Sequence, residues 1–334
     1  MDVGVIGLGK MGLLHAAIFN RLDGCRVTAL CDVNELMLKI LRSGNDDVRT
    51  YTDFQIMLDE NDLDIVVVAT PVFLHGSMAT TALKKGMHVL IEKPMAKTTE
   101  ECSTIIGNAN GSKSLVGYCR RFMPTYNSAK KLIEEEELGK VLSFRSHFYL
   151  SQVDKRMEGW QFDPYKGGGG ALIDLGCHAL DMVHYILGPM RSVSCRTERV
   201  ISESVEDVAR LELTLNSGVR GNLAVSWVES GYRLPEMMLE VTCEKGVARV
   251  AEKYLETVSN DGTVNKRFKQ CFPDPIPFNI GGREYTAEDL HLVESIRDAQ
   301  NTKCDIKVGS MPTSVIDSAY LSARDGQPQK VRYL

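Results

Sequence analysis

The chain has 334 residues, which is enough for two domains of ordinary size and too long for a single small module. Its formal net charge of -5, without any block of Lys and Arg, argues against nucleic acid or an anionic membrane as a partner, so we expect a small-molecule ligand. No stretch of about 18 apolar residues and no leader pattern occurs, which predicts a cytoplasmic protein. The 9 cysteines are odd in number and lack metal-ligand spacing, so we expect reduced thiols and no metal site.

The first motif is a glycine pattern that directly follows an apolar strand. The strand pattern beginning at Val3 leads into Gly7-x-Gly9-x-x-Gly12, and an amphipathic helical pattern follows. The first glycine permits a tight turn, the second lets the backbone approach a pyrophosphate, and the third lets helix and strand pack closely. The spacing predicts a dinucleotide with its phosphates at the helix N-terminus, bordered also by Lys10 and Met11. The alternative is a similar turn that binds no nucleotide.

A second apolar run, 27–31, ends in Asp32. This carboxylate lies about 20 residues after the glycines, where an acidic side chain accepts hydrogen bonds from the adenosine ribose. A carboxylate there also repels the 2'-phosphate of NADP. The sequence therefore predicts NAD as the cofactor, in preference to NADP.

Strand and helix patterns alternate over roughly the first 120 residues. Apolar runs at 3–7, 27–31, 64–69, 88–91 and 114–117 are separated by helical patterns at 11–21, 34–43, 73–85 and 99–108. Alternation of this kind predicts an α/β domain, a doubly wound parallel sheet covered on both faces, over residues 1–120.

The pattern changes after residue 120. A helix is predicted at 124–137, strands at 141–150, 192–200, 206–214, 218–228, 236–243 and 246–251, a hairpin turn at 216–218, and closing helices at 284–299 and 311–323. Residues 121–334 are therefore predicted to form an α+β domain with an open, mainly antiparallel sheet. An open sheet face needs a cover, which predicts a homodimer or homotetramer through that face.

Polar residues follow two strands of the predicted parallel sheet. Thr70-Pro71 with His75 follows the third major strand, and Glu92-Lys93-Pro94 follows the fourth. Ligands of open parallel sheets bind at the carboxyl ends of the strands, so we expect Thr70, Pro71 and His75 to line the cofactor and Lys93 to project toward the nicotinamide. The alternatives are a His75 that contacts only backbone and a Lys93 that pairs with Glu92 at the surface.

A buried helix is predicted after the glycine run Gly167–Gly170. Its polar exceptions, Asp174, His178 and Asp181, are spaced i, i+4 and i+7 and would share one stripe. Burying such groups is costly unless they are paired, so the stripe indicates a cleft; the alternative is a core histidine bonded to a carboxylate. The glycines predict a loop where backbone approaches a ligand or another segment.

These motifs together resemble the glucose-fructose oxidoreductase and inositol dehydrogenase (Gfo/Idh/MocA) family of NAD(P)-dependent oxidoreductases. The residues that carry the resemblance span nearly the whole chain: Gly7 to Gly12, Ala69-Thr70-Pro71 with His75, Glu92-Lys93-Pro94, Gly117-Tyr118 with Arg121-Phe122, Gly168 to Gly170 with Asp174, His178 and Asp181, and Tyr285 with Glu288. The chain departs from the family at Val72, where Asn is frequent, and at Gln161, where Arg is frequent.

The resemblance implies a Rossmann domain followed by an open-sheet domain, with dimers or tetramers as assemblies and sugars, inositols, nucleotide sugars or other polyols as substrates. It implies that Lys93, Asp174 and His178 act on the reacting hydroxyl or ketone, and that Glu92 and Arg121 belong to the cofactor side. Histidine titrates near neutral pH and suits a general base, while a lysine would stabilise a developing alkoxide.

The function predicted is hydride transfer between NAD and a secondary hydroxyl or ketone. Two alternatives stay open. One is an NAD-dependent glycosidase or lyase that oxidises its substrate only transiently, and the other is a non-enzymatic sensor that binds the dinucleotide.

Overall fold

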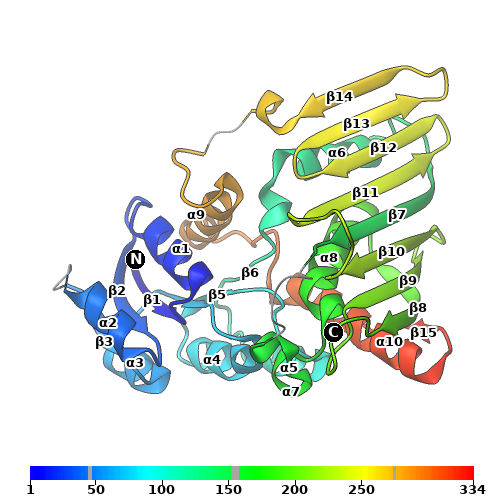
Figure 1. Cartoon of the computed structure of the whole chain (residues 1–334). Helices are drawn as coiled ribbons and strands as arrows, with labels where there is room; N and C mark the ends of the chain where they lie inside the picture. Colours follow the sequence, from blue (N-terminus) through cyan, green and yellow to red (C-terminus); the bar gives the residue numbers. More distant parts are fainter. Residues whose placement is uncertain (44–46, 152–157, 274–275) are drawn as a thin grey trace. The chain divides into compact units, whose positions relative to one another are not determined.

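The computed structural model describes residues 1–43, 47–151, 158–273 and 276–334 (Figure 1). Internal contacts divide the chain into two units, one formed by Met1–Cys119 with Ile276–Ser310 and the other by Arg120–Pro275 with Met311–Leu334. Residues 276–310 thus belong to the first unit although they follow most of the second in the sequence. Each unit is described by itself.

The first unit is built on six parallel strands in the order β3-β2-β1-β4-β5-β6. Their bounds are β1 Asp2–Ile6, β2 Arg26–Cys31, β3 Arg49–Tyr51, β4 Ile65–Val68, β5 His88–Ile91 and β6 Ser114–Val116. The central strand β4 is wholly buried, as expected when helices cover both faces. The predicted doubly wound parallel sheet is confirmed, and the strand order reverses between β1 and β4.

The helices of this unit begin at side-chain caps where the sequence supplies them. They are α1 Lys10–Phe19, α2 Glu35–Arg42, α3 Phe54–Glu60, α4 Val72–Lys84, α5 Thr99–Ile106 and α9 Arg283–Arg297. Asn34, Asp53 and Thr98 each accept a hydrogen bond from a first-turn N–H of α2, α3 and α5. Strand β3 and helix α3 are additional to the elements predicted from the sequence.

The carboxyl ends of five strands, β2, β1, β4, β5 and β6, lie in register. Backbone hydrogen bonds continue the ladders one residue beyond the strands: Gly7 N donates to Cys31 O, Ala69 N to Ile6 O, Glu92 N to Val68 O and Gly117 N to Ile91 O, at 2.8 to 2.9 Å. The motifs predicted to bind the cofactor therefore start side by side along one edge of the sheet.

The second unit contains a nine-stranded sheet in the order β14-β13-β12-β11-β7-β10-β9-β8-β15. The strands are β7 Val141–Tyr149, β8 Met190–Glu198, β9 Val208–Leu215, β10 Arg220–Ser226, β11 Glu236–Cys243, β12 Gly246–Ala251, β13 Tyr254–Ser259, β14 Val264–Phe268 and β15 Gln329–Lys330. Among the strands that the structure describes in this sheet, β7 and β10 are the one parallel pair, so the predicted, mainly antiparallel sheet is confirmed. The predicted turn joins β9 to β10, with Gly218 at a φ of 91°.

The second unit also contains helical segments. They are η1 Cys119–Phe122, α6 Pro124–Glu134, η2 Trp160–Phe162, α7 Pro164–Gly167, η3 Leu172–Gly176, α8 Cys177–Leu187, η4 Lys269–Cys271 and α10 Ile306–Asp325, whose first turns belong to the first unit. Helix α6 contacts β12 and β13, and α8 contacts β7. Along β9, buried residues alternate with exposed Arg210 and Glu212, so one face forms the core.

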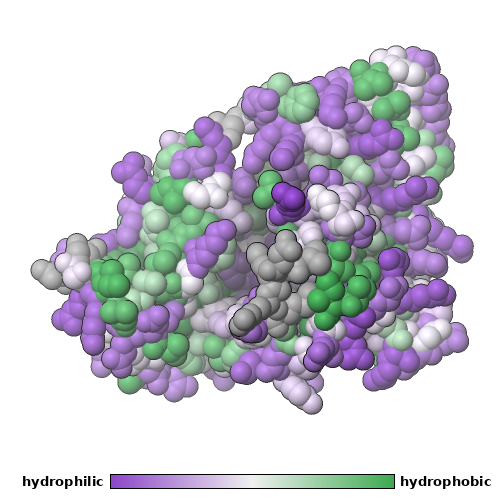
Figure 2. Space-filling view, viewed as in Figure 1, coloured by the Kyte–Doolittle hydropathy of each residue, from purple (hydrophilic) through white to green (hydrophobic). Residues whose placement is uncertain are grey.

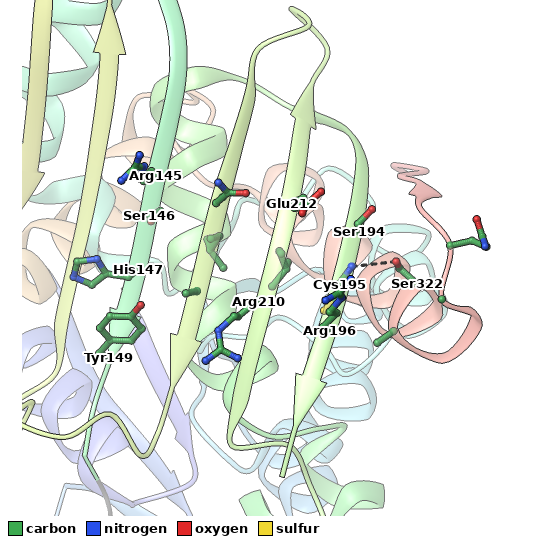
Figure 3. A pocket seen from close by; sticks show the side chains of 17 residues that line it. Arg145, Ser146, His147, Tyr149, Ser194, Cys195, Arg196, Arg210, Glu212 and Ser322 are labelled. Atoms are coloured by element: carbon green, nitrogen blue, oxygen red, sulfur yellow. Dashed lines mark hydrogen bonds between the residues drawn. The ribbon is translucent and has the colours of Figure 1, made fainter. Parts of the chain in front are cut away.

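Polar side chains cover the opposite face of the sheet. Figure 3 shows Arg145, His147 and Tyr149 on β7 and Arg210 and Glu212 on β9, with β10 between the two strands; these residues line a groove of about 660 Å³. The groove extends to Arg196 on β8 and to Ser322 of α10. This face is the one for which the sequence predicts a cover.

The surface shows no large continuous apolar face in the view drawn. Figure 2 shows hydrophilic residues over most of it, with a hydrophobic patch where Figure 1 places α2 and α3. Exposed Leu36, Ile40 and Ile56 lie on these two helices. Among the described residues, no helix combines the length and apolar character needed to cross a membrane.

Candidate functional site

The three glycines after β1 have different surroundings. Gly7 has a φ of +89°, and a Cβ on Gly12 would lie 1.8 Å from Gly7 O, so this turn and its packing on α1 need both glycines. A Cβ on Gly9 would meet nothing within 4 Å. Gly9 immediately precedes α1. The second glycine therefore leaves open space before the helix N-terminus, the place where the sequence predicts the pyrophosphate.

Asp32 ties the glycine loop to the end of β2. Its Oδ2 accepts a hydrogen bond from Leu8 N at 2.6 Å, and its Oδ1 accepts one from Asn34 N at 2.8 Å. Spacing predicted a contact with ribose but not these backbone bonds. The carboxylate therefore orders the loop in addition to any ligand it binds.

His75 links the segments that follow β4 and β5. Its side chain is buried, with Nε2 2.8 Å from Thr70 O and Nδ1 3.0 Å from Pro94 O. Burial lowers the pKa of His75, so the ring stays neutral at ordinary pH and donates to one of these carbonyls. The contacts are those of the backbone-binding alternative, and they fix the turn at Thr70-Pro71.

Glu92 is buried, which is incompatible with a surface ion pair. Only 7% of the residue is exposed, and its Oε2 accepts a hydrogen bond from Lys93 N at 2.9 Å. The Lys93–Pro94 peptide bond is cis. The other carboxylate oxygen of Glu92, Oε1, lies 3.0 Å from His15 Nε2. Glu92 thus holds the backbone of the residue predicted to act on the substrate.

His15 has partners that sequence spacing did not suggest. Its Nδ1 lies 2.9 Å from Asp289 Oδ1, and both residues are fully buried. Burial acts to lower the pKa of His15, but Asp289 and Glu92 outweigh it, and the pKa is raised well above its ordinary value. His15 and Asp289 are 274 positions apart, so no spacing in the sequence connects them.

The glycine run of the second unit approaches another segment of the chain. Glu206 accepts hydrogen bonds from Gly170 N and Leu172 N at 3.0 Å and from Tyr320 Oη at 2.7 Å. A Cβ on Gly169 would lie 1.9 Å from Tyr320 Oη, and one on Gly170 would lie 1.9 Å from Glu206 O. Of the two predicted causes of this glycine loop, close approach of another segment is the one observed.

The predicted single helix after this run begins as a π-helix, η3, and continues as α8. Asp174 on η3 accepts a hydrogen bond from Trp227 Nε1 at 3.1 Å. His178 on α8 is buried beside the ring of Phe148, with a centroid distance of 5.9 Å. Short π-helical segments are frequent at functional sites, and η3 carries Asp174, which is predicted to be catalytic together with His178 and Lys93.

Asp181 has a different surrounding from the other two polar residues of the stripe. Arg121 donates to it from Nε at 2.9 Å and from Nη2 at 2.6 Å, and both side chains are buried. Burial raises the pKa of Asp181, while Arg121 acts in the opposite direction. The guanidinium also lies over the ring of Tyr185. The pair lies within the second unit, so any contact of Arg121 with the cofactor stays a prediction, as do the roles of Lys93, Asp174 and His178.

Family models match both parts of the chain. A model described as "Oxidoreductase family, NAD-binding Rossmann fold" matches residues 1–118, and a GFO/IDH/MocA C-terminal domain model matches residues 126–249. The chain belongs to the Gfo/Idh/MocA family of NAD-binding oxidoreductases. Its resemblance to this family is thereby confirmed.

Curated and solved relatives agree with this assignment. D-apiose dehydrogenase of Paraburkholderia graminis is 25% identical over 99% of this chain and 89% of its own. Levoglucosan dehydrogenase of Pseudarthrobacter phenanthrenivorans is 30% identical over 58% of this chain and 53% of its own. A structure of levoglucosan dehydrogenase in complex with NADH has a TM-score of 0.90 at 21% identity and covers 100% of both chains, which establishes a shared fold.

The residues of this Gfo/Idh/MocA protein fit the family's NAD. The open space at Gly9, the helix that starts at Lys10, and the carboxylate of Asp32 at the end of β2 are the features that a dinucleotide needs in a Rossmann unit. All three lie on the same edge of one sheet.

Proposed function

We propose that this oxidoreductase transfers hydride between NAD and a secondary hydroxyl or ketone of a sugar or polyol. The observation that carries the proposal is the open space at Gly9 before α1, in a chain that belongs to an NAD-binding family. The names of the relatives, which are dehydrogenases of apiose and levoglucosan, support a sugar-like substrate.

The residues of this chain have separate roles in the proposal. NAD, when bound, takes up the hydride in the oxidation and returns it in the reduction. In the oxidation the substrate C–H bond breaks with its electron pair, and the hydroxyl proton passes to a ring nitrogen of His178. The Lys93 ammonium stabilises the negative charge that develops on the substrate oxygen, a contribution that is greatest where water is excluded.

Asp174 binds a substrate hydroxyl or orients His178. The bond from Trp227 Nε1 to Asp174 Oδ2 supports this role, because it fixes the direction of the carboxylate. Precise orientation of such a group is worth a large part of a rate enhancement.

Asp32 sets a preference for NAD over NADP in this proposal. Its two oxygens accept the backbone N–H groups of Leu8 and Asn34, which fixes the carboxylate at the end of β2, and we expect a ribose 2'-phosphate to come close to it. Repulsion between the two anions disfavours NADP.

The polar face of the nine-stranded sheet is proposed to bind a second copy of the chain. Arg145, Arg210 and Glu212 present both signs of charge on one groove. A two-fold axis would set positive groups of one copy against negative groups of the other.

Nine free cysteines support a reducing compartment, the cytoplasm, as the location.

The test is a substrate panel read by NADH absorbance. The panel contains D-apiose, levoglucosan, glucose 6-phosphate and inositols, each with NAD and with NADP. We expect NADH to form with at least one sugar or polyol and NAD to be preferred. Binding of NAD without turnover of any compound would favour the sensor. Product without net NADH would favour a glycosidase or lyase, and preference for NADP would contradict the role of Asp32.

A further inference from the structure

A histidine lies between carboxylates inside the first unit. His15 of α1 has Nδ1 at 2.9 and 3.0 Å from the two oxygens of Asp289 on α9, and Nε2 at 3.0 Å from Glu92 Oε1 after β5. A carboxylate oxygen of Glu288, also buried on α9, lies within 4.8 Å of a ring nitrogen of His15 and of a carboxylate oxygen of Asp289. Three segments far apart in the sequence therefore meet at one imidazole.

The contacts determine the protonation state of the ring. A neutral imidazole has one N–H donor and one lone-pair acceptor, whereas an imidazolium has two donors. Both ring nitrogens of His15 face carboxylate oxygens, which only accept hydrogen bonds when ionised. With Glu92 and Asp289 both ionised, only the imidazolium donates a hydrogen bond to each of them, and the raised pKa of His15 agrees with this state.

The charged groups around His15 continue to Lys93. Glu92 joins the imidazolium through Oε1 and the Lys93 N–H through Oε2. Burial acts to raise the pKa of Glu92, but His15 and the charge of Lys93 lower it below its ordinary value. Glu92 is thus an ionised group that one oxygen links to the ring of His15 and the other links to the backbone of Lys93.

Stability alone is a weak reason for this arrangement. Buried ion pairs seldom stabilise a fold more than apolar residues of the same size would, because the charges lose their hydration. A fully hydrogen-bonded network does impose one geometry on its members. The member that is connected to proposed chemistry is the Glu92-Lys93 segment.

We infer that His15 is a permanent imidazolium that positions Lys93 through Glu92, and that Asp289 keeps His15 charged. His15 and Asp289 are positioning residues and not catalytic ones, because they touch neither substrate nor cofactor in this scheme. The inference rests on the proposed function for the role of Lys93, but its protonation part does not.

The protonation part is tested by nitrogen NMR of the full chain, without substrate. We expect both ring nitrogens of His15 to stay protonated as the pH is raised through neutrality. In Asp289→Asn, loss of one carboxylate should lower the pKa of His15, so that the ring titrates. A neutral His15 in the unmodified protein at neutral pH would overturn the inference.

The positioning part is tested by kinetics of the same Asp289→Asn variant. We expect kcat to fall as the pH rises through the His15 titration measured by NMR, a limb that the unmodified protein lacks over that range. His15→Gln, which cannot be an imidazolium, should lose kcat by about 10²-fold, the effect of a misplacement near 1 Å. The Kd for NAD should stay within about threefold, since neither variant alters the glycine loop.

His88→Gln is the matched control. His88 lies on β5, the strand that leads to Glu92, and its Nδ1 accepts a hydrogen bond from Lys113 N. We expect kcat of this variant to stay near that of the unmodified protein. If His15→Gln does not fold, the kinetics of Asp289→Asn still test the positioning role, and the NMR titration still tests the protonation state of His15.

Two outcomes separate the inference from the proposed function. A shifted His15 titration with an unchanged kcat profile would overturn the positioning role while leaving Lys93 in the mechanism. Normal turnover in Lys93→Met would overturn both the role of Lys93 and the positioning, whereas the NMR result would still decide whether His15 is a permanent imidazolium.

Discussion

Single residues in the glycine loop divide into those that the fold requires and one that it does not. Gly7 and Gly12 face backbone atoms at distances that no Cβ tolerates, while Gly9 faces open space. A side chain at Gly9 therefore leaves the protein's own packing untouched and occupies only the space before α1.

Gly9→Ala separates ligand binding from folding. We expect the melting temperature to stay nearly unchanged and the Kd for NAD to rise by about tenfold or more, since a methyl group keeps the pyrophosphate from the backbone. Isothermal titration calorimetry and thermal unfolding measure the two quantities. Gly76→Ala, in the interior of α4 with free space around it, is the control and should bind NAD normally. Unchanged NAD affinity in Gly9→Ala would place the pyrophosphate elsewhere.

The proposed catalytic side chains make a second prediction at this scale. Lys93→Met and His178→Ala should each lower kcat by about 10²- to 10⁴-fold, as expected for loss of an electrostatic stabiliser or a general base. Steady-state kinetics with the substrate found in the panel measure the change, and fluorescence titration with NADH checks that the cofactor still binds. Normal kcat in both variants would remove these residues from the mechanism.

Spacing predicts a residue's role when its partner is a ligand or a near neighbour. Asp32 was predicted to bind ribose because such a carboxylate lies at a fixed distance after the glycines, but its bond to Leu8 N was not predicted. His15 and Asp289 meet only in three dimensions, and Glu206 reaches Gly170 across 36 positions. A sequence pattern has no register that connects such pairs.

Among the elements, the start of η3 depends on one buried carboxylate. Glu206 accepts N–H groups of Gly170 and Leu172, which otherwise lack partners at a helix start, and Tyr320 adds a third hydrogen bond. Burial raises the pKa of Glu206, while these hydrogen bonds oppose the change. The segment that carries Asp174 is therefore held at its first turn.

Gly170→Ala should disturb this element. Its new Cβ would overlap Glu206 O, so we expect the free energy of unfolding to fall by about 2 kcal/mol or more, in the range of severe single substitutions. Chemical denaturation measures it, and Gly76→Ala is the matched control that should gain a few tenths to about 1 kcal/mol. We also expect a lower kcat, because Asp174 shifts with η3. Full stability in Gly170→Ala would contradict the tight packing.

Elements with a strong period were predictable, and short or exposed ones were not. The main helices and the buried strands lie close to their predicted positions because their apolar residues recur at 3.6 or at 2. Strand β3 has only three residues, and β14 is exposed throughout, so neither produces an apolar pattern. The π-helix η3 was not predicted, because the apolar pattern over residues 172–187 indicated one continuous helix.

At the scale of the whole molecule, the proposed assembly can be tested through charge. Glu212→Arg leaves only positive charge among Arg145, Arg210 and position 212 of the groove, so two copies should repel one another there. Analytical ultracentrifugation should show a shift toward monomer at low salt. Glu212→Arg combined with Arg145→Glu restores mixed charge and is expected to recover association. An unchanged sedimentation profile in Glu212→Arg would exclude this face as the contact.

The parallel and the antiparallel sheet could both be predicted from the sequence. That residues 276–310 belong to the first unit could not. Alternating strand and helix patterns predict a parallel sheet, and period-two patterns predict an antiparallel one. Nothing in the helical pattern near 284–299 tells which sheet it joins. Contacts place α9 with the first unit, where Asp289 meets His15.

The late position of Asp289 also has a consequence for synthesis. His15 and Glu92 emerge from the ribosome well before Asp289, which follows His15 by 274 residues. Domains tend to fold in the order in which they are made, from the amino end. Until α9 appears, the nascent dinucleotide unit lacks Asp289, one of the two carboxylates that contact His15, so completion of this cluster waits for synthesis through α9.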